Sequence, residues 1–127
     1  MPNVVLDASA LLALLNSESG ADVVAESIPE AVINAVNLSE VVGKLIKAGM
    51  PEKAIREALM GLDLEVISFD EEQAYSTGLL RSMTDEFGLS LGDRICLDTA
   101  RRLGIPALTA DKMWADLSMD IDVRLIR

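Results

Sequence analysis

Near its start the chain reads VVLDASALL over residues 4–12. Three apolar residues run into Asp7, and small residues then lead into a second apolar run with helical spacing. This pattern predicts a short β-strand that ends on an acid and is followed at once by a helix, which is one half of a βαβ unit. Since the rest of the chain repeats the pattern, Asp7 is the reference point for the other acids.

Strand-like and helix-like segments alternate along the whole chain. We expect strands at residues 4–6, 31–34, 64–67, 106–109 and 121–125. We expect helices at residues 8–16, 21–27, 37–48, 51–60, 70–83, 90–103 and 111–117. The alternation predicts an α/β sandwich with a largely parallel sheet. Because no linker, repeat or low-complexity tract interrupts it, we expect a single domain over residues 1–127.

The composition excludes several classes of function. The net charge of −10 argues against generic nucleic-acid binding, unless divalent cations fill an acidic site and present positive charge to phosphate. The absence of histidine excludes histidine-based catalytic triads and the usual zinc ligands. The single cysteine, Cys96, and the lack of a membrane-spanning apolar run or a signal peptide favour a reducing, cytoplasmic setting.

Four acids occupy equivalent places in the predicted elements. Asp7 ends the first strand, and Asp111 follows the fourth. Glu40 and Asp93 lie in the first turns of two predicted helices. In an open parallel sheet, ligands bind outside the carboxyl ends of the strands, so these acids can converge although they are far apart in sequence.

Helix capping is the alternative interpretation of the same acids. Acids at helix N-termini are stabilised by capping and by the helix dipole, whatever the function. Asn37 and Glu40, and likewise Ser90 and Asp93, have the spacing of a capping box. The two acids that follow strands could be N-caps themselves.

Four further polar residues are weaker candidates for a site. Ser9 and Thr109 could orient ligands, although short hydroxyls after strands also make caps and turns. Arg94 could meet a phosphate or be a solvated helix residue. Asp98 could border the same pocket or have a structural role, and Cys96 is expected to be a small core residue rather than a nucleophile.

Four blocks of the sequence together resemble the PIN domain, and more narrowly the VapC toxins of type II toxin–antitoxin modules. The blocks are VVLDASALL (4–12), NLSEV (37–41), LSLGDR (89–94) and GIPALTAD (104–111). The resemblance covers nearly the whole chain in order. It implies a three-layer α/β sandwich whose parallel five-stranded sheet has the order 3-2-1-4-5, with a switch point between strands one and four.

The resemblance also implies an activity. It implies an endoribonuclease dependent on Mg²⁺ or Mn²⁺, in which Asp7, Glu40, Asp93 and Asp111 are the catalytic, metal-binding acids. Ser9 and Thr109 match hydroxyl positions beside this quartet. Such toxins dimerise and are neutralised by a VapB-like antitoxin that covers the active site. Asp98 departs from the pattern, because many relatives carry a small residue there; the extra carboxylate would alter metal affinity or face solvent.

Other classes of protein remain as alternatives. One is a PIN-like module that binds RNA or protein without cutting, and another is a housekeeping PIN nuclease without an antitoxin. A dehalogenase-type phosphatase needs a second acid two residues after Asp7, where the chain has Ser9. A phosphoacceptor receiver domain finds only a partial match in Asp70 and Lys112.

Overall fold

A computed structural model describes the whole chain, residues 1–127. Five parallel strands form one sheet in the order β3-β2-β1-β4-β5. The order implied by the resemblance is therefore confirmed. The strands are β1 (Val4–Leu6), β2 (Ala31–Asn34), β3 (Glu65–Ile67), β4 (Ala107–Thr109) and β5 (Val123–Leu125).

The centre of the sheet is β1. Its Leu6 is in register with Ile33 of β2 on one side and with Leu108 of β4 on the other. All residues of β1 are buried, as expected for a parallel strand covered on both faces. Because the chain runs outward from β1 through β2 to β3 and then returns to β4, the strand order reverses between β1 and β4. This is the predicted switch point, where ligand sites of open parallel sheets lie.

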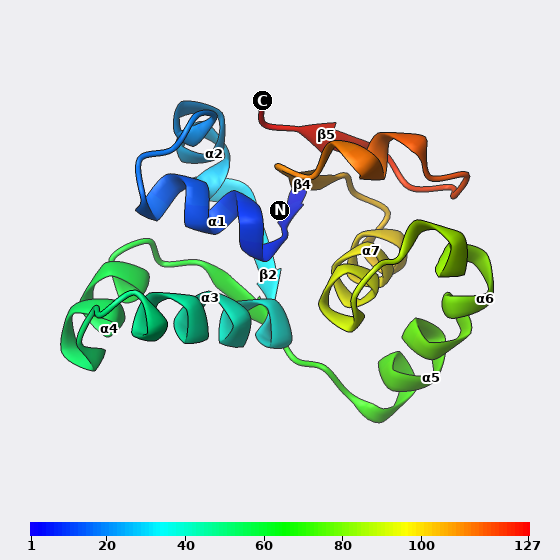
Figure 1. Cartoon of the computed structure of the whole chain (residues 1–127), viewed down its shortest axis with the longest axis horizontal. Helices are drawn as coiled ribbons and strands as arrows, with labels where there is room; N and C mark the ends of the chain where they lie inside the picture. Colours follow the sequence, from blue (N-terminus) through cyan, green and yellow to red (C-terminus); the bar gives the residue numbers. More distant parts are fainter.

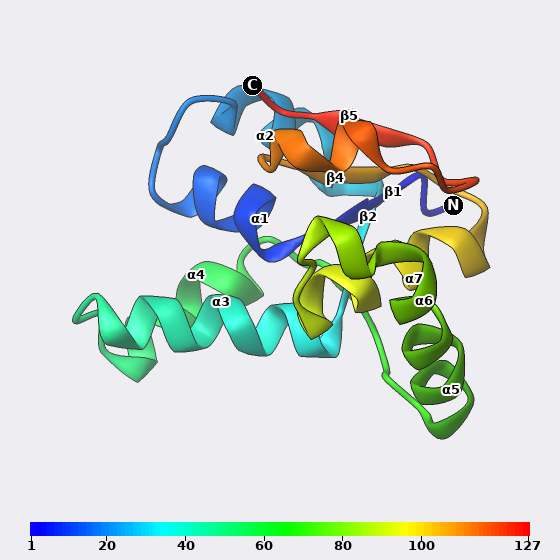
Figure 2. The same ribbon diagram turned by 45° about the vertical axis from the view of Figure 1, so that its right-hand side comes forward.

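Helices cover both faces of the sheet and make the expected three layers (Figures 1 and 2). They are α1 (Ala8–Leu15), α2 (Ala21–Ser27), α3 (Ala35–Lys47), α4 (Glu52–Met60), α5 (Glu71–Leu79), α6 (Arg81–Thr84) and α7 (Leu91–Leu103). Short 3₁₀ turns cover Ile28–Glu30, Asp85–Phe87 and Lys112–Asp116. None of the helices combines the length and the apolar character needed to span a membrane.

Two apolar cores lie on opposite faces of the sheet, because successive side chains of a strand point to opposite faces. Val4 and Leu6 pack with α1 to α4 in one core. Val5 packs in the other with Cys96 of α7 and with Trp114. The helices α5 and α6 lie outside α7, away from the sheet (Figure 2). Because all five strands are parallel, the connections that leave the strands lie at one edge of the sheet, where β1 and β4 end.

The start of α3 differs from the prediction. The helix begins at Ala35, because the side chain of Asn34 caps it by accepting a hydrogen bond of 2.9 Å from the Val36 amide. Asn37 is therefore inside the helix, and Glu40 lies in its second turn rather than its first. The capping-box interpretation of Asn37 and Glu40 is wrong, since asparagine at the end of β2 is itself a favoured N-cap.

Several other boundaries differ as well. The helix expected over residues 70–83 divides into α5 and α6, and a 3₁₀ turn follows where we expected a loop. Gly78, near the break, has a low helix propensity. The segment after β4 is a 3₁₀ turn, and β5 begins at Val123. These are local shifts that leave the topology unchanged.

The sheet order also decides against the receiver-type site. β3 is an edge strand, separated from β1 by β2. Asp70, which follows β3, is thus not beside Asp7. Its carboxylate caps α5 by accepting a hydrogen bond of 2.8 Å from the Gln73 amide, as an acidic first turn predicts.

Candidate active site

Asp7 lies at the carboxyl end of β1, with only 4% of its surface exposed. It is the N-cap of α1, and its Oδ1 accepts a hydrogen bond of 2.8 Å from the Ala10 amide. The hydroxyl of Ser9 donates to Oδ1 over 2.7 Å, and that of Thr109 donates to Oδ2 over 2.6 Å. The capping prediction for Asp7 is confirmed. The cap and its two hydroxyl donors hold both carboxylate oxygens in place.

Burial governs the ionisation of Asp7. Burial raises the pKa of its carboxyl above the ordinary value, and the charge of nearby Asp93 raises it further. Hydrogen bonds from Thr109, Ala10 and Ser9 act in the opposite direction but do not outweigh burial. A buried carboxylate without a cationic partner is costly. The structure therefore favours binding of positive charge at Asp7.

Glu40 and Asp93 come from two facing helices, α3 and α7. The side-chain amide of Asn37 donates a hydrogen bond of 3.0 Å to Glu40 Oε1. Asp93 forms the predicted capping box with Ser90: the Ser90 amide donates to Asp93 Oδ2 over 3.0 Å, and the Asp93 amide donates to Ser90 Oγ over 3.1 Å. Each carboxylate is thus held by a neighbour on its own helix.

Three of the acids act on the buried thiol of Cys96. Burial raises the pKa of its thiol well above the usual value, and the charges of Asp7, Asp93 and Glu40 raise it further. These three acids are therefore near enough to act on the same buried thiol. Cys96 itself stays a neutral core residue, as expected from the sequence.

The backbone of Asp111, the fourth acid, is connected to Asp7 through Thr109. Its backbone amide donates a hydrogen bond of 3.0 Å to the same Thr109 hydroxyl that donates to Asp7. Its own side chain is exposed and caps the following 3₁₀ turn by accepting 3.0 Å from the Met113 amide. This confirms the second N-cap predicted after a strand.

The donor chemistry of these acids fits a hard divalent cation. None of the five ion pairs in the structure involves Asp7, Glu40, Asp93 or Asp111, so the four acids have no basic partner. Carboxylate oxygens are the ligands that Mg²⁺ and Mn²⁺ prefer. As the side chains stand, however, no three acidic or thiol groups lie close enough together to hold one ion.

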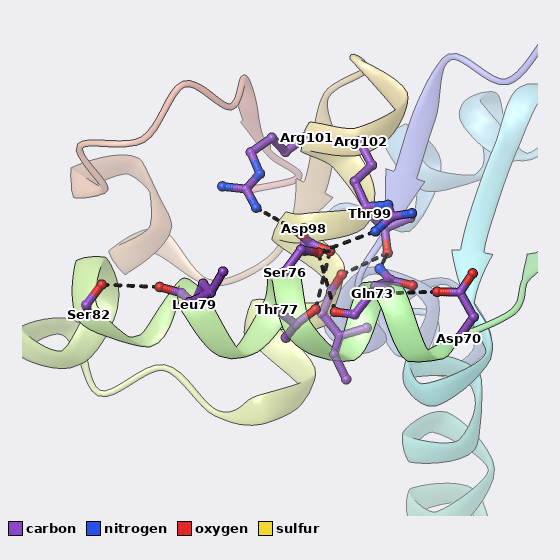
Figure 3. A network of polar contacts seen from close by, with 11 residues as sticks. Asp70, Gln73, Ser76, Thr77, Leu79, Ser82, Asp98, Thr99, Arg101 and Arg102 are labelled. Atoms are coloured by element: carbon purple, nitrogen blue, oxygen red, sulfur yellow. Dashed lines mark hydrogen bonds and ion pairs between the residues drawn. The ribbon is translucent and has the colours of Figure 1, made fainter.

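Asp98 lies in a different place from the quartet. Its fully buried carboxylate accepts hydrogen bonds from Ser76 over 2.6 Å and from Thr77 over 3.3 Å, and it pairs with Arg101 over 2.8 Å. These contacts join α5 to α7 (Figure 3). The alternative in which Asp98 faces solvent is wrong, and the alternative of a structural role is confirmed, because Asp98 holds two helices together.

Arg94 makes no contact with an acid. Its Nη1 donates a long hydrogen bond of 3.5 Å to the Leu89 carbonyl, and its buried Nε has no partner. The side chain is half-buried beside the loop before α7. It is therefore not the solvated helix residue that one alternative described.

Sequence reasoning missed two residues of the site, Asn37 and Gly92. Asn37 is 1% exposed and donates a second hydrogen bond of 3.0 Å to the Gly92 carbonyl of α7. The only signal in the sequence was a polar residue at a position of α3 that the helix period places on the buried side. That signal is lost when the helix is assumed to start at Asn37.

A hollow of about 330 Å³ opens beside Ser9, between α1, α3 and the C-terminal residue. Its lining includes two basic side chains, Lys44 and Arg127. Arg127 is tied to Glu18 over 3.4 Å, whereas Lys44 forms no ion pair. Since Ser9 also donates to Asp7, this hollow adjoins the acidic region.

A family model described as the PIN domain matches residues 4–118. A search of curated proteins found no match. Among solved structures, the DNA-bound VapBC complex from Salmonella typhimurium is similar with a TM-score of 0.78 and 18% identity over 100% of both chains.

Two further structures have the same fold. A toxin–antitoxin complex from Klebsiella pneumoniae matches with a TM-score of 0.76 and 22% identity over 98% of each chain. VapBC-5 from Mycobacterium tuberculosis matches with a TM-score of 0.60 and 22% identity over 99% of each chain. At such identities the likeness concerns the fold. Because the family model spans nearly all of the described residues, the chain belongs to the PIN domain family, a family of nucleases.

Proposed function

We propose that this chain is an endoribonuclease dependent on Mg²⁺ or Mn²⁺, and that it is the toxin of a toxin–antitoxin pair. The observation that carries the proposal is the set of acids at the carboxyl edge of the sheet. Asn37 connects Glu40 to the turn of α7 that carries Asp93, the Thr109 hydroxyl connects the Asp111 amide to Asp7, and none of the four acids has a basic partner. Clustered carboxylates repel one another, and a divalent cation relieves that repulsion.

The proposal gives each acid a role. Asp7, Asp93 and Asp111 would bind the cation directly, and Glu40 would bind it directly or through water. A cation bound there would lower the pKa of a water and stabilise negative charge on the scissile phosphate. Ser9 and Thr109 orient the Asp7 carboxylate through their hydrogen bonds.

The reaction is hydrolysis of a phosphodiester bond. Water attacks phosphorus in line, the bond to the 3′ oxygen breaks, and the products are a 5′-phosphate and a 3′-hydroxyl. The 2′-hydroxyl of RNA is not the nucleophile in this route. The chain has no histidine to drive the alternative, cyclising route.

A net charge of −10 has to be reconciled with an RNA substrate. We infer that flanking phosphates meet positive charge in the hollow beside Ser9, where Lys44 has no acidic partner. Lysine and arginine contacts to phosphates contribute much of the affinity for nucleic acid. Local positive charge and the bound cation together would offset the global negative charge.

The antitoxin is the second part of the proposal. The similar structures include a toxin–antitoxin complex and members of the VapBC family of toxin–antitoxin systems. An antitoxin segment carrying basic residues would complement the acidic site and the net negative charge of this chain. We therefore expect a short neighbouring reading frame that ends in a basic segment, a homodimeric toxin by light scattering, and a cytoplasmic location. Absence of such a frame would favour a housekeeping PIN nuclease.

The decisive experiment is RNA cleavage by the purified, antitoxin-free protein. We expect cleavage with Mg²⁺ or Mn²⁺, no cleavage with EDTA, and at least about a hundredfold lower rate for Asp7→Ala. Activity that survives EDTA, or an unchanged rate in D7A, would contradict the metal-nuclease proposal. Binding of RNA without cleavage by a metal-loaded protein would favour the alternative of a non-catalytic PIN module.

A further inference from the structure

Asn37 connects two acids that come from different helices. Its buried side-chain amide donates one hydrogen bond of 3.0 Å to Glu40 Oε1 on α3 and another of 3.0 Å to the Gly92 carbonyl on α7. Both partners are acceptors, so the amide nitrogen must be the atom that faces them. The contact therefore ties the Glu40 carboxylate to the first turn of α7.

Gly92 makes room for this arrangement. A Cβ atom at this position would overlap with both carboxylate oxygens of Glu40. The backbone of α7 thus approaches the Glu40 carboxylate so closely that a side chain at position 92 would force this carboxylate to move. The need for glycine here is one of space, because the residue lies within a regular helix.

The next residue after Gly92 is Asp93. Its carboxylate is held on the same turn by the capping box with Ser90. Because the Asn37 side chain fixes Gly92 relative to Glu40, it also fixes the backbone of Asp93 relative to Glu40. No basic residue makes this link, so the two acids are held in register without being neutralised.

Burial of the Asn37 side-chain oxygen costs folding free energy. Its Oδ1 is buried and accepts no hydrogen bond. A buried polar atom without a partner destabilises the folded state. An apolar residue would avoid this cost, but it could not donate to Glu40 and Gly92 together.

We propose that Asn37 is a positioning residue that, with Gly92, sets the separation of Glu40 and Asp93 for divalent-cation binding. This inference rests on the proposed function, because it assigns a role within the same site. Groups that orient metal ligands typically contribute about 10- to 100-fold to metal affinity or activity. We expect an effect of that size for Asn37.

The test measures Mn²⁺ binding to the full-length protein by electron paramagnetic resonance, without reference to catalysis. Asn37→Ala should weaken Mn²⁺ binding by about 10-fold or more. The matched control is Gln73→Ala, which removes another buried amide, one on α5 that donates to Thr99 and accepts from Asn34 instead. Q73A should lower the melting temperature but leave Mn²⁺ affinity unchanged.

A second pair of variants tests the space at Gly92 and decides the matter if N37A does not fold. Gly92→Ala should displace the Glu40 carboxylate and weaken Mn²⁺ binding by about 10-fold. Gly43→Ala is its control, since a Cβ there meets nothing within 4 Å. G43A should bind Mn²⁺ like the wild type.

Two results would overturn the inference, and they are distinguishable. Wild-type Mn²⁺ affinity in folded N37A and G92A would show that Asn37 does not position the ligands, while the nuclease proposal would stand. A wild-type protein that neither binds Mn²⁺ nor cleaves RNA would refute the proposed function, and the inference with it.

Discussion

Thr109 and Asp7 are 102 positions apart in the sequence, yet the Thr109 hydroxyl donates a hydrogen bond of 2.6 Å to Asp7 Oδ2. The same hydroxyl oxygen accepts a hydrogen bond of 3.0 Å from the Asp111 amide. One fully buried side chain therefore connects the ends of β1 and β4 at the switch point of the sheet.

Thr109→Val should lower both stability and activity. Valine has nearly the same shape but neither donates to Asp7 nor accepts from the Asp111 amide, so about 1–3 kcal/mol of the free energy of unfolding should be lost. The rate of RNA cleavage should fall because the Asp7 carboxylate loses a fixed donor. Urea unfolding and cleavage assays measure the two effects.

Thr84→Val is the matched control for this substitution. Thr84 is also buried, but its hydroxyl donates to the carbonyl of Leu80, which lies between α5 and α6, outside the acidic site. T84V should lose stability while its cleavage rate per folded molecule stays at the wild-type level. A similar loss of rate in both variants would contradict a specific role for Thr109.

Asp7→Asn should stabilise the metal-free protein at neutral pH. Burial raises the pKa of Asp7 in the folded state, so the folded protein binds more protons than the unfolded chain between the unfolded and folded pKa values. Stability therefore falls as pH rises through that window, and the cost persists above it. Asparagine carries no charge and avoids this cost.

The measurement is a series of thermal melts in EDTA from about pH 4 to pH 8. D7N should melt a few degrees above the wild type at the upper end, and the difference should disappear at low pH, where Asp7 is protonated in both states. A D7N protein that is less stable at every pH would show that burial of the charge is not the dominant effect.

Lys44→Ala should weaken RNA binding in a salt-dependent manner. If Lys44 meets one phosphate beside Ser9, its loss should reduce the slope of log affinity against log salt by about 0.7, the value for one contact to a single strand. Binding of RNA in the presence of Ca²⁺, at several salt concentrations, measures the slope.

Lys47→Ala is the control for charge alone. Lys47 is an exposed residue of the same helix that does not line the hollow. K47A should keep the wild-type slope. Equal slopes in K44A and the wild type would show that Lys44 does not contact an RNA phosphate.

Asp98→Ala should destabilise the fold without changing the chemistry. The buried carboxylate pairs with Arg101, which is 38% exposed, and accepts from two hydroxyls of α5, so we expect a loss of about 2 kcal/mol. Glu52→Ala breaks an exposed ion pair with Arg56 and should change stability by less than about 0.5 kcal/mol. Chemical unfolding distinguishes the two variants, and Mn²⁺ affinity should be unchanged in both.

A lower Mn²⁺ affinity in folded D98A would show that Asp98 contributes to the metal site.

Local sequence rules predicted the caps well. Asp7, Asp111 and the Ser90–Asp93 pair each cap the element that the sequence indicated, because capping depends on residues that are at most three positions apart. The one wrong cap, Asn37, arose because two asparagines near the end of β2 compete for the same role. Asn34 is the cap because it is the residue on which the strand ends.

Capping and a role at the site do not exclude each other. The cap hydrogen bonds of Asp7, Asp93 and Asp111 also fix the positions of their carboxylates in the metal-free protein. The local interpretation that competed with the functional one therefore describes part of how the site is built.

By itself the sequence determined the alternation of strands and helices, the four acids after strands or near helix starts, and the absence of histidine, because these depend on composition and on short-range periodicity. Only the tertiary structure decided that Thr109 reaches Asp7, that Asp98 faces α5, and that Asn37 ties Glu40 to Gly92. Each of these contacts joins residues more than 20 positions apart. Their partners are brought together by the packing of buried apolar faces, which no local pattern records.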